Sequence, residues 1–368
     1  MILRKIINNI DVKSLSWCLT QISGCKTFSV KPFFIYATGS KQLTLMYSKQ
    51  SKLYSIILFA GVALFLKVDI AFSTVKLGGT PWTYDRGIAG AKGPDEWETL
   101  NGNWSCNGRK QSPIDVGTDQ VMQKDPTNPP NLRLTVAGNK PITGEIRNNG
   151  YAPTFFLAEE LTVKLAGGLL QENYFLKQFN FHFGCNDTVG SEHTIDGNTY
   201  PIELHMVFWD NTNYATYELA AQGEDGLAAV AVLYELPMAN ISATPANNAL
   251  EKIARLLNNV VEENSNYVVT QSEGLHIEDL APLLVSPDVA DRFYKYKGSL
   301  TTPGCYESVT WFVMNNHPQI TEKEMMAFRN LKSSKAHAQG PNVGRMCNNF
   351  RNVMPLNGRQ IHSNIVLE

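Results

Sequence analysis

Short segments rich in β-branched and aromatic residues recur along most of this chain, with turn-forming residues between them. Segments beginning at Leu161, Ile202 and Ser308 are clear examples, and several alternate apolar and polar side chains. A period of two is typical of strands that are buried on one face. The pattern therefore predicts a β-dominated α+β domain, of about 290 residues, that begins near residue 78.

Helical patterns are fewer. The best covers residues 247–261 and places Leu250, Ile253, Leu257 and Val260 on one face. Thr321 and Glu324 form a capping box before a second apolar pattern. We expect both segments to be short helices that pack on the sheet.

Overall composition is that of a folded protein. The chain has 43% hydrophobic and 18% charged residues and a net charge of -2. These values exclude disordered, collagen-like and coiled-coil classes. A near-neutral balance also argues against a nucleic-acid partner, which would favour a basic face.

The first 75 residues differ from the rest because their only acids are Asp11 and Asp69. An apolar run at 56–66 is too short to span a bilayer comfortably. Lysines precede it, and the small-x-small site Ala71-Phe-Ser73 follows. This order is typical of a secretory signal peptide over residues 46–73, starting at Met46. Residues 1–45 are then an unusual extension or a wrongly assigned start. The alternatives are a short signal-anchor and an apolar segment of the mature protein.

Four cysteines lie beyond the predicted signal peptide: Cys106, Cys185, Cys305 and Cys347. An even number of cysteines in a secreted chain suggests disulfide bonds. Glycosylation sequons at Asn103, Asn186 and Asn240 fit a glycoprotein of the same compartment.

Two predicted strands carry polar side chains on one face. Residues two apart in a strand share a face, so Gln178, Asn180 and His182 project together. Glu203, His205 and Val207 do so on the second strand. Such a pair of strands is one way to build a zinc site, with Gln178 and Glu203 orienting the ligand two residues further along. The alternative is that the histidines are half-buried and hydrogen-bonded inside a barrel or sandwich.

Separate motifs along residues 80–365 resemble, in the same order, those of the α-class carbonic anhydrases. They are Trp82-Thr-Tyr84, Gly93-Pro-Asp-Glu-Trp97, Gln111-Ser-Pro-Ile-Asp115, Gln178-Phe-Asn-Phe-His-Phe-Gly184, Gly190-Ser-Glu-His-Thr194, Glu203-Leu-His205, Tyr296-Lys-Gly-Ser-Leu-Thr-Thr-Pro303, Val309-Thr-Trp311 and Asn357-Gly-Arg-Gln-Ile361. The resemblance implies the α-carbonic anhydrase fold over residues 78–368. That fold has a central, mostly antiparallel twisted sheet of about ten strands with short peripheral helices.

The implied activity is the reversible hydration of CO₂ to bicarbonate and a proton by a zinc-bound hydroxide, for which carbonic anhydrase is the type case. The family's metal ligands fall on Asn180, His182 and His205. Thr301 matches the threonine that accepts the hydrogen bond of the hydroxide and donates its own to a glutamate, here Glu192. Other substrate positions fall on Thr302, Val207, Leu300, Val309 and Trp311, with Ala229 in place of a usual valine.

Two positions depart from the family. Asn180 replaces a ligand histidine, and an amide oxygen is a harder, weaker donor to Zn²⁺ than an imidazole nitrogen. Tyr151 stands at the proton-shuttle position, where a phenol with a pKa near ~10 relays protons poorly. These residues predict a carbonic anhydrase with weakened zinc binding and slow proton transfer. Loss of a ligand histidine also marks the non-catalytic related proteins, so a secreted binding or matrix protein, for example in biomineralisation, is the alternative.

Cys106 and Cys305 match the disulfide of the secreted family members, whereas Cys185 and Cys347 either pair or remain free thiols. We therefore expect a secreted, extracellular protein without a stable membrane span. A receptor ectodomain is disfavoured because no transmembrane run follows residue 75. The expected small-molecule partners are CO₂ and bicarbonate.

Overall fold

The computed structural model describes residues 36–38, 42–44, 82–85, 91–122, 131–159, 161–171, 173–237, 248–281, 284, 292–333 and 343–364. The chain divides into two units, Met1–Gly78 and Gly79–Glu368. In the first unit, β1 (Tyr36–Thr38) pairs antiparallel with β2 (Gln42–Thr44). The predicted signal peptide, residues 46–73, and the sequon at Asn240 lie outside the described residues.

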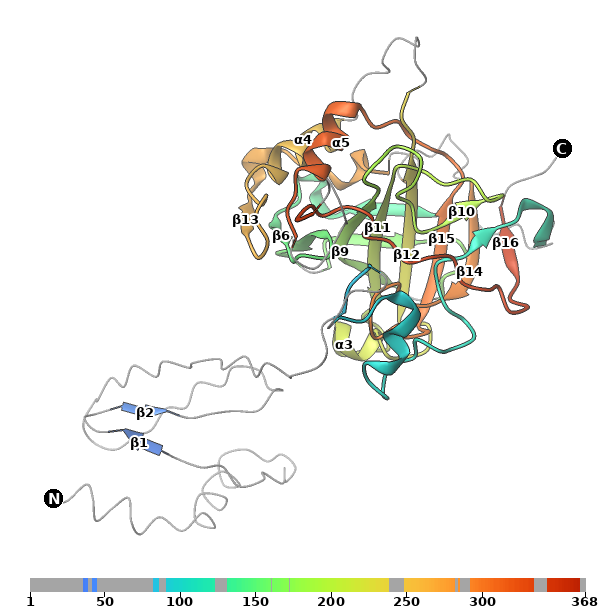
Figure 1. The fold of residues 1–368 in the computed structure, drawn as a ribbon, viewed down its shortest axis with the longest axis horizontal. Coiled ribbons are helices and arrows are strands. Elements are labelled where there is room, and N and C mark those ends of the chain that lie inside the picture. The colour runs from blue at the N-terminus through green and yellow to red at the C-terminus, as the bar shows by residue number, and fades with distance from the viewer. Residues whose placement is uncertain are drawn as a thin grey trace. The chain divides into compact units, whose positions relative to one another are not determined.

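A twisted, mixed sheet of 12 strands dominates the second unit (Figure 1). Its main path runs β13, β6, β7, β9, β11, β12, β15, β14, β16, β4, while β8 pairs with β9 and β5 pairs with β8. The strands are β4 (Val121–Met122), β5 (Arg133–Val136), β6 (Gly144–Asn148), β7 (Pro153–Leu157), β8 (Val163–Ala166), β9 (Tyr174–Phe183), β11 (Ile202–Asp210), β12 (Leu227–Tyr234), β13 (Asn266–Val269), β14 (Phe293–Gly298), β15 (Val309–Met314) and β16 (Ile361–Ser363). A separate parallel pair consists of β3 (Asp115–Val116) and β10 (Thr194–Ile195).

Helical elements are short, as the sequence predicts. They are α3 (Tyr217–Ala220), α4 (Asn248–Leu257) and α5 (Glu322–Arg329), with 3₁₀ turns η1 (Pro94–Thr99), η2 (Thr118–Gln120), η3 (Ala137–Asn139), η4 (Gln271–Glu273) and η5 (Ile277–Asp279). The β-dominated class is therefore confirmed.

The main path of the sheet has the ten strands that the resemblance implies, and β8 and β5, which lie off this path, bring the total to 12. The reason lies in β9, which is 10 residues long. One part of β9 pairs with β7, and its beginning pairs with β8, which brings β5 with it. The sheet is mostly antiparallel, although β12 pairs in parallel with β15, as does β16 with β4.

The central strands are buried at every position of β11 and β12. On one face, Phe179, Leu204 and Met206 join a core cluster that also contains the apolar residues of α4 and α5. On the other face, Val207 and Trp311 join a second cluster. The predicted period of two is thus observed, and it separates an apolar face under the helices from the face that carries the polar residues.

Helix α4 ends at Leu257, so it buries Leu250, Ile253 and Leu257 of the predicted stripe, whereas Val260 is buried just beyond the end of the helix. At the start of α5, Glu324 N–H donates to Thr321 Oγ1 at 3.2 Å, and Thr321 N–H donates to Glu324 Oε2 at 2.8 Å. This capping box is the one that the sequence predicts. Figure 1 shows α4 and α5 together beside the sheet, and their apolar residues belong to one cluster.

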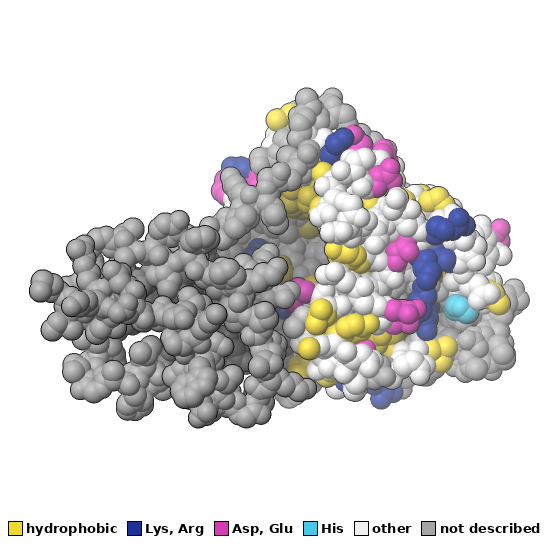
Figure 2. Space-filling view, turned by 90° about the horizontal axis from the view of Figure 1, so that it is seen from below, with side chains coloured by type: hydrophobic (Ala, Val, Ile, Leu, Met, Phe, Trp, Pro, Cys, Tyr) yellow, Lys and Arg dark blue, Asp and Glu magenta, His cyan; other side chains and the backbone are white. Residues whose placement is uncertain are grey.

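The surface of the second unit carries both signs of charge. On the face shown in Figure 2, basic side chains lie beside acidic ones. Lys92 pairs with Glu96 and Lys297 with Asp225 on the surface. This mixture agrees with the near-neutral composition. Among the described residues, no helix has the length and apolarity needed to cross a bilayer.

Candidate metal centre and active site

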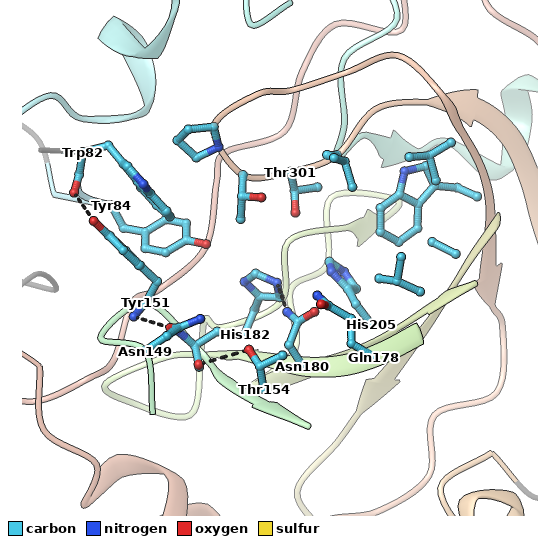
Figure 3. Close-up of a pocket in the computed structure, with 18 of the residues that line it drawn as sticks. Trp82, Tyr84, Asn149, Tyr151, Thr154, Gln178, Asn180, His182, His205 and Thr301 are labelled. Carbon is cyan, nitrogen blue, oxygen red and sulfur yellow. Dashed lines mark hydrogen bonds between the residues drawn. The ribbon is translucent and has the colours of Figure 1, made fainter. Parts of the chain in front are cut away.

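A pocket of about 220 Å³ opens on the polar face of the sheet (Figure 3). Strands β9 and β11 form its floor, and the loop after β14 lies over it. Its lining residues are Trp82, Tyr84, Asn149, Tyr151, Ala152, Thr154, Gln178, Asn180, His182, His205, Val207, Tyr217, Ala229, Leu300, Thr301, Thr302, Pro303, Val309 and Trp311. The structure therefore brings together all the residues predicted for metal and substrate, together with Tyr151 and Gln178.

His205 on β11 is held from behind by a carboxylate. Its Nε2–H donates to Glu203 Oε1 at 2.6 Å, so Nδ1 is the nitrogen left to bind a metal. His193 Nδ1–H donates to the same oxygen at 2.6 Å. Glu203 Oε2 accepts the backbone N–H groups of Glu192 and His193, both at 2.8 Å. Glu203 therefore makes the contact with His205 that its predicted orienting role requires, and His193 and two backbone N–H groups bind the same carboxylate.

These contacts set the charges on this side of the site. Burial alone would raise the pKa of Glu203, but the neighbouring His193 and His205, with their hydrogen bonds, hold it far below its usual range. For His205, burial opposes protonation, yet the Glu203 carboxylate outweighs it and raises the pKa. Glu203 is thus a carboxylate that makes His205 a more basic ligand.

His182 on β9 has a different partner. Its Nδ1 lies 2.6 Å from the backbone carbonyl oxygen of Asn349. Because a carbonyl only accepts, Nδ1 carries the proton and Nε2 has the free lone pair. Burial lowers the pKa of His182, so the neutral ring is favoured. A metal would bind Nε2.

Asn180 lies opposite His205 in the pairing of β9 with β11 and is partly buried. Its Nδ2 lies 2.8 Å from His182 Nε2. Since Nε2 is an acceptor in this tautomer, the amide N–H₂ donates to it. The amide therefore occupies the lone pair that a metal would need.

For Gln178, the sequence predicts an orienting contact with Asn180. It lines the pocket, but within the described residues no hydrogen bond joins it to Asn180. An asparagine side chain has no second ring nitrogen for a neighbouring acceptor to orient.

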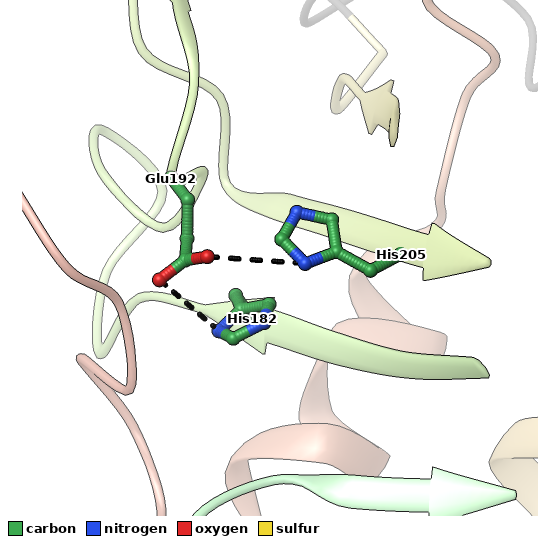
Figure 4. Close-up of side chains that lie close together, drawn as sticks. All are labelled: His182, Glu192 and His205. Atoms are coloured by element: carbon green, nitrogen blue, oxygen red, sulfur yellow. Dashed lines mark ion pairs between the residues drawn. The ribbon is translucent and has the colours of Figure 1, made fainter. Parts of the chain in front are cut away.

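Glu192 lies close to both imidazoles (Figure 4). Its Oε1 is 3.6 Å from His182 Nδ1, and its Oε2 is 3.8 Å from His205 Nδ1. Arg351 N–H donates to Oε1 at 2.7 Å. Within the described residues Oε2 has no hydrogen bond, so the predicted bond from Thr301 is not formed. A buried carboxylate oxygen without a donor is costly, and the Thr301 hydroxyl, which lines the pocket, is the donor that the resemblance implies for it.

Tyr151 stacks on Trp82 with ring centroids 3.6 Å apart and an interplanar angle of 6°. Its hydroxyl donates to the Trp82 carbonyl at 3.2 Å. Burial, with the charge of Glu263, raises the pKa of Tyr151 to about 12. Such a hydroxyl holds its proton at neutral pH, which strengthens the prediction of poor proton relay.

Two disulfide bonds are present in the described chain, Cys106–Cys305 and Cys185–Cys347. The first is the pair implied by the resemblance, and it joins the loop that carries Thr301 and Thr302 to an earlier segment. The second resolves the alternative left open by the sequence in favour of pairing.

Within the described residues, His182, Glu192 and His205 have potential metal-binding atoms within 4.8 Å of one another. Two imidazoles therefore fit zinc, whereas the third position offers an amide that now donates a hydrogen bond. Zinc would need the amide of Asn180 to turn its oxygen inward.

The sequence does not reveal two contributors. Asn349 acts through its backbone carbonyl and Arg351 through its backbone N–H. Every residue has such groups, so no residue type could have indicated them.

Comparison with known proteins agrees with this geometry. A family model described as eukaryotic-type carbonic anhydrase matches residues 92–365. Carbonic anhydrase 1 of Monodelphis domestica is 32% identical over 280 residues, which cover 76% of this chain and 96% of that protein. Carbonic anhydrase 1 of Mus musculus is also 32% identical over 280 residues, covering 76% of this chain and 98% of its own.

Proposed function

This chain belongs to the eukaryotic-type carbonic anhydrase family, and we propose that it catalyses the reversible hydration of CO₂ with weakened zinc binding and slow proton transfer. The observation that carries the proposal is the pair of oriented imidazoles, in which His182 Nε2 and His205 Nδ1 are the unprotonated nitrogens that a metal would bind once the Asn180 amide turns away from Nε2. Asn180 is the observation that weakens it.

When bound, zinc supplies a Lewis acid that makes water nucleophilic near neutral pH. The protein's own residues hold and aim the reactants. Glu203 fixes His205, and the Asn349 carbonyl fixes His182. Thr301 and Thr302 line the pocket over these ligands, where a hydroxyl that donates to Glu192 Oε2 would orient the attacking oxygen.

An apolar wall suits CO₂, which is small and uncharged. Val207, Val309 and Trp311 are buried in one cluster, with Leu300 packed against it. All four line the pocket. This wall would hold CO₂ without competing for the polar groups above the imidazoles.

The decisive experiment measures zinc content and CO₂ hydration of the purified protein. We expect Asn180→His to raise zinc affinity by about 100-fold or more, because it supplies the third nitrogen ligand, and to raise hydration with it. Gln178→His is the matched control, since it places an imidazole one pleat away on the same face of β9. A hydration rate and zinc affinity that Asn180→His leaves unchanged would contradict our account of the site.

A second candidate function is that of a non-catalytic binding or matrix protein with this fold. It is favoured by the hydrogen bond from Asn180 to His182 Nε2, which satisfies the site without a metal. Undetectable zinc, together with absence of sulfonamide-sensitive hydration, would leave this candidate.

We also propose that the protein is secreted. The apolar run at 56–66, the exposed sequons at Asn103 and Asn186 and the two disulfide bonds support an oxidising compartment. Expression of the full chain in a secreting eukaryotic cell tests this. We expect the protein in the medium, with a mass that falls after removal of N-linked glycans; retention inside the cell would contradict it.

A further inference from the structure

Residues 347–351 form neither helix nor strand, yet this segment supplies two contacts to the site. The Asn349 carbonyl accepts His182 Nδ1–H at 2.6 Å, and the Arg351 N–H donates to Glu192 Oε1 at 2.7 Å. Asn349 is fully buried. The position of this irregular segment therefore holds the proton on His182 Nδ1, while the Asn180 amide donates to Nε2 from the pocket side.

Point contacts hold the segment against the end of β9, since it has no ladder of its own. Asn348 N–H donates to the Phe183 carbonyl at 2.8 Å, and Phe183 N–H donates to Asn349 Oδ1 at 2.8 Å. Cys185 N–H donates to Asn348 Oδ1 at 3.0 Å. The Cys185–Cys347 disulfide is the covalent link of the same contact, with Cα atoms 5.0 Å apart.

In sequence, this disulfide lies close to the two residues that form the contact, His182 and Asn349. Cys185 lies just beyond the end of β9, which carries His182, and Cys347 precedes Asn349 in the segment. We propose that the Cys185–Cys347 disulfide is a positioning element of the metal site, which keeps the Asn349 carbonyl on His182 and so keeps Nε2 turned to the pocket. The proposal rests on the metal site of the proposed function, but its main readout needs neither bound metal nor turnover.

The role matters more here than in a site with three histidines. Asn180 leaves two imidazoles, so each must be aimed by the protein before a metal arrives. Groups that orient a ligand histidine from behind typically change metal affinity by about 10–100-fold when removed. On β11 that group is the carboxylate of Glu203, whereas on β9 it is a carbonyl on a segment without regular structure.

The other disulfide provides a matched control. Cys185–Cys347 has a sequence separation of 162, and Cys106–Cys305 has one of 199. Because loop-closure entropy rises only with the logarithm of loop length, the two bonds restrict the unfolded chain almost equally. A bond that only stabilises the fold therefore predicts similar consequences for both pairs.

The experiment compares Cys185→Ala/Cys347→Ala with Cys106→Ala/Cys305→Ala in the full chain. Long-range ¹H–¹⁵N NMR of the metal-free protein reports the tautomer of His182, and competition with a chelator gives the affinity for Zn²⁺. We expect the first variant to lose the pure Nδ1–H signature and to bind Zn²⁺ about tenfold or more weakly. The control should keep the signature and its affinity within about twofold. An unchanged His182 signal in the first variant, or the same change in both, overturns the proposal.

A milder variant keeps the proposal testable if the first does not fold. Asn348 has φ +55°, a left-handed conformation that glycine adopts readily, so Asn348→Gly removes the acceptor of Cys185 N–H without backbone strain. Both disulfides remain. Because the proposed positioning bond is still in place, we expect this variant to keep the Nδ1–H signature and an affinity for Zn²⁺ close to that of the unchanged protein. Loss of the signature in this variant would show that the hydrogen bond, and not the disulfide, positions the segment, and would overturn the proposal.

Discussion

The two strands beneath the pocket hold their halves of the site in different ways. On β11, His205 is bonded to a buried carboxylate that also binds His193 and two backbone N–H groups. On β9, Asn180 faces the pocket, is partly buried and has one hydrogen bond, to His182. The β11 side cannot change one member without leaving a buried charge unpaired. The β9 side can change Asn180 at small energetic cost to the fold. Asn180 and Tyr151, the two positions that the sequence predicts to depart from the family, both line the pocket.

The largest expected effect comes from breaking the β11 side. Glu203→Ala removes the acceptor of four donors, namely the rings of His193 and His205 and two backbone N–H groups, and it removes the buried charge beside His205. We expect it to lower the free energy of unfolding by about 3–5 kcal/mol. Gln178→Ala, at a comparable place on β9, should lower it by less than about 1 kcal/mol. Urea denaturation of both variants measures the difference, and equal losses would refute the contrast between the strands.

A smaller effect is expected from repairing proton transfer on the other side. Tyr151→His, made together with Asn180→His, replaces a hydroxyl of raised pKa by a group that titrates near neutral pH. We expect hydration at low buffer concentration to rise about tenfold. Added imidazole should accelerate CO₂ hydration by the Asn180→His single variant and so remove the difference in rate between the single and the double variant. Tyr151→Phe is the control, which should not change the rate because the hydroxyl donates to Trp82. A large loss in Tyr151→Phe would show that the phenol does relay protons.

The smallest effect is a difference in how the two imidazoles respond to pH in the metal-free protein. Burial lowers the pKa of His182 in the folded protein. Below about pH 6.5 the unfolded chain therefore binds more protons at this residue than the folded protein does, and the free energy of unfolding decreases as the pH is lowered. Burial opposes protonation of His205, but Glu203 outweighs it and raises the pKa of His205. The stability that protonated His205 gives the folded protein is therefore fully present below about pH 6.5, and it is lost as the pH rises through the pKa of the folded state.

Removing each histidine should therefore change the pH profile in opposite directions. Between pH 8 and pH 5, His182→Gln should flatten the loss of stability on acidification, and His205→Gln should steepen it. Urea denaturation across this range, with a chelator present, measures both slopes. Slopes that change in the same direction would mean that the two imidazoles do not differ in environment as described.

Much of the site could be predicted from local sequence. The alternation along β9 and β11 placed Asn180, His182 and His205 on one face, and the structure confirms that face as the pocket floor. The capping box of α5 was equally local. The number of strands could not be predicted from local sequence, because β9 is long enough to pair with β7 and β8 in succession. The role predicted for Gln178 rested on its spacing from residue 180, which is an asparagine and has no ring N–H for Gln178 to orient.

The sequence by itself determined the β-dominated class, the two faces of the sheet and which side chains share the pocket, because these depend on the period of neighbouring residues. Only the tertiary structure decided which lone pair each imidazole presents. That choice depends on the carbonyl of Asn349, separated from His182 by 167 positions, and on the carboxylate of Glu203. It also decided that Cys185 pairs with Cys347. A backbone group has no residue-type signal, and its position becomes defined only when distant segments pack together.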